Sequence, residues 1–159
     1  MQELLTTPAL AAWLRRALLI AGLAASGLAQ AQFSMVPAPQ VLAPPRASAA
    51  EIEKEYRIDA AKHLYSAYPT RIYRGRLPPL LYSVMVVETE IDATGQVVNV
   101  HIVRKPAAAE VAPWVVAMIR RAGPFPPPAK FNGGVRNTEI WLVHKSGLFQ
   151  LDTLTEGQD

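Results

Sequence analysis

The chain has 159 residues, enough for one modest domain, and its formal net charge is only +3. It contains no cysteine, which excludes a disulfide framework, a thiolate metal site and a cysteine nucleophile. Because the charge excess is small and no basic stripe is interleaved with aromatic residues, the composition does not favour a nucleic-acid partner.

Residues 1–31 have the pattern of a secretory signal peptide. The pair Arg15-Arg16 precedes an apolar run of about 15 residues that closes on an Ala-Gln-Ala ending at Ala31. A helix that spans a bilayer needs about 20 predominantly apolar residues, so a permanent anchor is the weaker interpretation. We expect cleavage between Ala31 and Gln32 and a location in a bacterial periplasm. The alternative is an uncleaved N-terminus that keeps the chain in the membrane.

Residues 32–47 contain four prolines and show neither a helical nor a strand period. This composition predicts an extended linker. The folded domain is expected at residues 48–154, followed by a disordered tail at residues 155–159.

The domain is predicted to open with a helix. Ser48 and Glu51 match a capping box, which places the start of the helix there. Pro69 ends it, because the residue before a proline avoids α geometry. The apolar stripe recurs every three or four residues and consists of Ile52, Tyr56, Ala60, His63 or Leu64, and Ala67.

Residues 68–80 are aromatic, basic and rich in proline, without a regular period. We interpret them as a solvated connection in which Tyr68 and Tyr73 pack beneath the chain. A recognition surface for an acidic or extended partner is the alternative.

The clearest pattern lies at residues 81–104 and predicts two strands joined by a tight turn. Met85, Val87, Thr89 and Ile91 share one face of the first arm, while acidic residues occupy the other. This period of two is typical of a strand with one buried face. Gly95 supplies the positive φ of a type I turn followed by a bulge, so the arms are expected to pair antiparallel.

A second helix is predicted at about residues 112–122, where Val115, Met118, Ile119 and Ala122 form an apolar stripe with Trp114 at its edge.

A last strand is predicted at residues 138–144. Ile140 and Leu142 lie on one of its faces, and Trp141 and Val143 lie on the other. Residues 148–151 are a candidate for an additional short strand. The order helix, strand, strand, helix, strand predicts an α+β domain with a three-stranded antiparallel sheet and helices packed on one face.

No pattern in the chain predicts catalysis or metal binding. His63, His101 and His144 do not fall in a metal-ligand spacing. Glu88 and Glu90 share one strand face, whereas glycosidase carboxylates flank a cleft from separate elements. We therefore expect a binding module that is not an enzyme and needs no cofactor. A small periplasmic enzyme or metal protein that uses the three histidines is the less favoured alternative.

The order of these signals resembles the C-terminal periplasmic domain of TonB, with the related domain of TolA a near second. Tyr68-Pro69 is similar to the Tyr-Pro that opens the TonB domain. Residues 84–102 are similar to the TonB hairpin, whose Asp-Gly, Val and Asn-Val signals resemble Gly95-Gln96-Val97 and Asn99-Val100 in this chain. The alanine-rich helix ending at Ala122, followed by Phe125, is similar to the TonB helix that closes with an aromatic residue and a proline. The resemblance covers about residues 60–145.

The resemblance implies a binding function. The TonB domain binds an extended segment of an outer-membrane receptor by adding it as a strand at the edge of its sheet. The implied edge in this chain is the stretch 138–144. The implied partner-binding residues are Tyr68, Pro69, Thr138, Ile140, Trp141, Val143 and His144.

The implied partner is an outer-membrane receptor or another envelope protein, with membrane contact only if the N-terminal segment is retained. In that case the chain would be a membrane-anchored energy transducer for outer-membrane transport, which is the alternative function. A homodimer formed through the same edge is a further option.

Overall fold

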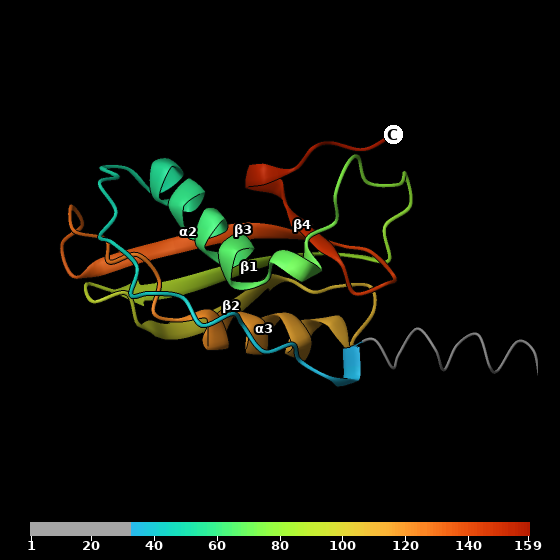
Figure 1. The fold of residues 1–159 in the computed structure, drawn as a ribbon, viewed down its shortest axis with the longest axis horizontal. Coiled ribbons are helices and arrows are strands. Elements are labelled where there is room, and N and C mark those ends of the chain that lie inside the picture. Colours follow the sequence, from blue (N-terminus) through green and yellow to red (C-terminus); the bar gives the residue numbers. More distant parts are fainter. Residues whose placement is uncertain (1–32) are drawn as a thin grey trace, which may run out of the picture.

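A computed structural model describes residues 33–159, so the predicted signal peptide lies outside the described residues. Four antiparallel strands form one sheet, and both main helices cover the same face of it (Figure 1). The predicted α+β class is confirmed, but the sheet has four strands instead of three. The elements in chain order are α2 (Glu53–Ala67), η1 (Pro69–Arg71), β1 (Ser83–Asp92), β2 (Val97–Arg104), α3 (Val111–Ala122), β3 (Gly134–Val143), β4 (Phe149–Leu151) and η2 (Asp152–Leu154).

The strands are ordered β2-β1-β3-β4 across the sheet. β1 and β3 pair over ten residues without a register shift. β4 adds only three pairs, opposite Trp141–Val143. The prediction that the last long strand lies at the edge of the sheet is therefore wrong, because the chain turns back at Gly147 and lays β4 against its end.

β3 begins at Gly134, four residues before the predicted start. Gly134 has a φ of +128°, and a Cβ on it would lie 2.3 Å from the carbonyl oxygen of Ile91. Only glycine allows the backbones of β1 and β3 to approach so closely at this point. The glycine therefore marks the start of a strand.

The predicted hairpin is confirmed. Met85, Val87, Thr89 and Ile91 are buried under the helices, as the alternation indicated. Gly95 has a φ of +90° and stands in the turn between β1 and β2.

The tip of this hairpin is fixed on the connection that follows α3. The N–H of Phe125 donates to the carbonyl of Gly95 at 2.8 Å. The carboxylate of Asp92 closes the turn by accepting the N–H groups of Thr94 and Gln96.

The apolar stripe predicted for the second helix is confirmed, because Trp114, Val115, Met118, Ile119 and Ala122 are all buried on α3.

The capping box predicted for the first helix is wrong, since α2 begins at Glu53. The Ser48 hydroxyl donates to Asp59 at 2.6 Å and accepts the N–H of Ala50, so a distant carboxylate holds it. Ile52 stands before the first helical residue and is exposed. The rest of the predicted stripe is buried.

The chain before α2 and the chain after η2 both lie along the domain. Phe33 stacks on Tyr82 with ring centroids 5.5 Å apart and meets the edge of Trp114. The N–H of Gln40 donates to the carbonyl of Ala67, at the end of α2. At the other end of the chain, the carbonyl of Gly157 accepts the N–H of Leu77, and the N–H of Asp159 donates to the carbonyl of Leu77. Both segments thus make more contact with the domain than their compositions predict.

Within residues 33–159, no helix has the length and apolar character that crossing a membrane requires.

Candidate binding edge

The two residues predicted at the start of the binding segment lie at the end of α2. Tyr68 is buried, and its hydroxyl donates to the carbonyl of Met118 at 2.8 Å. Burial raises the pKa of Tyr68 to about 12, which keeps this donor protonated. Pro69 begins η1. Tyr68 therefore links α2 to α3 and does not present its side chain to a partner.

The five residues predicted at 138–144 divide between the two faces of the sheet. Trp141 and Val143 are fully buried beneath the helices. Thr138 is exposed and Ile140 is half-buried, both on the uncovered face. His144 follows the strand, and its ring lies 5.1 Å from that of Tyr73. Only Thr138 and Ile140 combine a place in β3 with access to solvent.

The backbone of β3 shows where a further strand can be added. The N–H of His144 donates to Leu148, and Leu142 lies opposite Gln150, so the even-numbered residues direct their N–H and C=O groups away from β1. The same alternation directs the backbone groups of Arg136 and Thr138 to this side. β4 pairs no further than Trp141, and no strand of the described chain pairs with this side of β3 before that point.

We call the outward-facing backbone of residues 134–138 the β3 edge. Arg136 and Thr138 are exposed along it. Its register with β1 is regular throughout, so the backbone is straight enough to accept another strand.

The other open edge of the sheet, along β2, is less suited to pairing. Its register with β1 shifts twice, which leaves Val98 and Val103 without partners across the ladder. Both side chains are exposed, by 62% and 56%. Bulges twist an edge strand and are a common means of preventing it from pairing with other chains. The β3 edge is therefore the better candidate.

Glu139 marks the end of the β3 edge. Its Oε1 accepts the N–H of Ile140 at 2.9 Å and that of Thr153, in η2, at 3.4 Å. The side chain points into the helix-covered side, and the residue is only 3% exposed. Burial raises the pKa of this carboxyl. Its Oε2 is buried and has no hydrogen-bond donor among the described residues.

Arg57, on α2, is the cation nearest to this carboxylate. Its guanidinium lies 3.8 Å from Glu139 and 3.4 Å from Asp152. Its Nε donates to the Thr153 hydroxyl at 2.5 Å. Two carboxylates therefore share one guanidinium at the junction of α2, β3 and η2. The sequence pattern did not draw attention to Glu139, although a glutamate two residues before Trp141 on the inward face was the available signal.

The uncovered face of the sheet carries an apolar groove beside Ile140. The groove has a volume of about 420 Å³, and Leu80 projects beside it with 88% of its surface exposed. Its apolar lining from the strands consists of Val84, Val86, Ile140 and Leu142. The predicted two-faced character of β3 is thus present, with one face packed and the other open.

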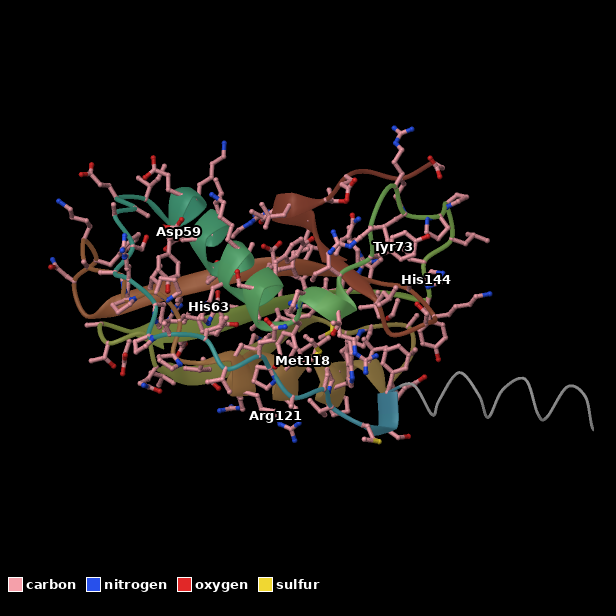
Figure 2. The ribbon with its side chains drawn as sticks, viewed as in Figure 1. Asp59, His63, Tyr73, Met118, Arg121 and His144 are labelled. Atoms are coloured by element: carbon pink, nitrogen blue, oxygen red, sulfur yellow. The ribbon has the colours of Figure 1, made fainter. Side chains whose placement is uncertain are left out.

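The structure does not bring the three histidines together. Figure 2 shows His63 and His144 well separated along the domain, and His101 pairs with Glu88 across β1 and β2. The Nε2 of His63 donates to the carbonyl of Ala122 at 2.7 Å. Among residues 33–159 there is no group of three or more side chains suited to hold a metal ion.

In comparisons with protein-family models, curated proteins and solved structures, nothing matches the chain. The class of protein is therefore defined by the fold and the site: an α+β domain with one uncovered sheet face and an unpaired stretch of strand backbone beside it.

Proposed function

We propose that the chain is a periplasmic binding module of TonB/TolA type. It recognises an extended segment of an outer-membrane receptor or another envelope protein by adding that segment to the sheet at the β3 edge. The regular, unpaired backbone at Arg136 and Thr138 carries this proposal, because unpaired N–H and C=O groups provide most of the affinity in strand addition. The resemblance of the hairpin to the TonB domain supports the same function.

The proposed segment pairs with residues 134–138 and does not extend along residues 140–144. β4 already occupies the outer side of Trp141–Val143, and Glu139 takes the outward N–H of Ile140. Side chains of the bound segment alternate between the helix side and the open face. On the open face they lie beside Arg136 and Thr138.

A photo-crosslinking amino acid at Thr138 tests this proposal in cells. We expect it to capture an envelope protein, whereas the same group at Asn99, an exposed position on β2, captures none. The variant Arg136→Pro removes an outward N–H without removing a bond to β1, so it should abolish the capture and leave the fold intact. Equal capture from both positions, or capture from Asn99 alone, would place the interaction elsewhere.

Export is tested by mass spectrometry of the protein from a periplasmic extract. A mature N-terminus at Gln32 agrees with the soluble module. A retained Met1 in a membrane fraction would instead favour the anchored energy transducer.

A further inference from the structure

We propose that the segment bound at the β3 edge presents a lysine or arginine side chain to the carboxylates of Glu139 and Asp152. This inference rests on the proposed function and specifies the chemical class of the partner. Its basis is the buried carboxylate of Glu139, which the described residues satisfy at only one of its two oxygens.

The unsatisfied atom is Oε2 of Glu139. It is buried and accepts no hydrogen bond from the described residues, although its neighbour Oε1 accepts two backbone N–H groups. Buried polar atoms in native proteins nearly always have a partner, and a buried charge without one is costly. A donor from a bound partner would remove that cost.

The charges around this atom point to a cationic donor. Arg57 lies between Glu139 and Asp152, and its Nε is occupied by Thr153. One positive charge therefore faces two negative charges. The side chain of Asp152 is 47% exposed, so the pair has an open side toward solvent. A second cation balances the cluster and adds charge-assisted hydrogen bonds.

Strand geometry brings the partner's side chain to this cluster. Residues directly opposite each other in adjacent strands point to the same face, with Cβ atoms about 4.5–5.5 Å apart. The partner residue next beyond the one paired with Thr138 lies opposite Glu139, at the end of the β3 edge. It therefore directs its side chain to the side covered by α2, toward Arg57 and Asp152. A lysine or arginine is long enough to reach past Arg57, which is itself 35% exposed.

Three synthetic peptides of sequence X-Thr-Val-Thr-Val-Thr, acetylated at the N-terminus and with X as Lys, Ala or Glu, test the inference. Antiparallel pairing places X opposite Glu139 and the other five residues opposite 134–138, short of β4. Each is titrated into the ¹⁵N-labelled protein, and the amide signals of Arg136 and Thr138 are followed. We expect the Lys peptide to shift both signals and to bind about tenfold more tightly than the Ala peptide, with the Glu peptide weakest. Glu139→Gln and Asp152→Asn should each reduce the preference for Lys, because each removes one carboxylate. Glu88→Gln on the open face of β1 is the matched control and should leave the preference unchanged.

The outcomes separate this inference from the proposed function. If all three peptides shift Arg136 and Thr138 with equal affinity, strand addition stands and the cationic preference is overturned. A preference for Lys that persists in both carboxylate variants also overturns it. If the peptides shift only amides of β2, or none at all, the β3 edge is not a strand-binding site and both proposals fail. Thermal melting of each variant confirms that it is folded.

Discussion

The backbone N–H of Ile140 donates to the side chain of the preceding residue, Glu139, across 2.9 Å. A partner strand that reaches Ile140 finds this donor already engaged. This single side-chain contact therefore sets the end of the pairing site at Glu139. Glu139 is the first residue to substitute.

Replacing Glu139 by glutamine is expected to stabilise the protein at pH 7. Burial raises the pKa of Glu139, so the folded state binds its proton more tightly than the unfolded state does. The stability from this group is fully present below the ordinary pKa of 4.5 and is lost as the pH rises through the folded pKa. Glutamine keeps an oxygen for Ile140 without the charge. Melting temperatures from pH 4 to pH 8 should show a gain over the native protein that grows with pH. A lower melting temperature at pH 7 would show that the pairing of Glu139 with Arg57 outweighs its burial.

We expect the protein to lose folding stability in mild acid because of the buried His63. Burial lowers its pKa, so the unfolded state takes up the proton first as the pH falls. Stability is therefore complete above the ordinary pKa of 6.5 and declines as the pH falls from there through the folded pKa. Urea denaturation at pH 7.5 and pH 5.5 should show a smaller decline for His63→Gln than for the native protein. His101→Gln, at an exposed position on β2, is the control and should decline as the native protein does.

Gly95→Ala should cost about 2–4 kcal/mol of unfolding free energy. A Cβ at this position would lie 2.0 Å from the carbonyl oxygen of Phe125, and φ is +90°. Gly75→Ala separates the two causes, because Gly75 also has a positive φ of +81° but has no atom within 4 Å of the added carbon. The control should cost about 1 kcal/mol, the conformational penalty alone. Equal costs in urea denaturation would mean that the hairpin tip can shift away from Phe125.

Phe33→Ala should destabilise the domain by about 2 kcal/mol, less than the 3–5 kcal/mol typical of a phenylalanine in a central core, because the ring belongs to the segment before α2 and not to the helices and strands that form the central core. The ring is buried against Tyr82 and Trp114. Met35→Ala, at a residue that is 79% exposed, should change the stability by no more than about 0.5 kcal/mol. If both variants unfold at the same urea concentration as the native protein, the segment before α2 adds nothing to the stability of the domain.

The local patterns of the chain predicted the hairpin and the second helix. Val87, Thr89 and Ile91 alternate with Glu88 and Glu90, and Gly95 fixes the turn, so neighbours in sequence determine this part of the structure. The stripe on α3 is equally local.

The parts that sequence could not predict depend on distant partners. Ser48 has the residue type of a helix cap, but Asp59 takes its hydroxyl. Phe149–Leu151 is too short to show a period and becomes a strand only because Trp141–Val143 lies beside it. The candidate site lies at residues 134–138 and not at the predicted 138–144 for the same reason, because the position of β4 decides which part of β3 remains unpaired.

The length of β4 decides how much of the sheet edge is available to other chains. After Leu151 the chain leaves the sheet at η2. Each residue added to the end of β4 would pair with one more residue of β3 that is now unpaired on its outer side. Seven added residues, roughly 23 Å of strand, would pair with the rest of β3 down to Gly134. A short C-terminal strand therefore leaves part of β3 free to pair with another chain, whereas a long one would pair with all of β3 and close this edge.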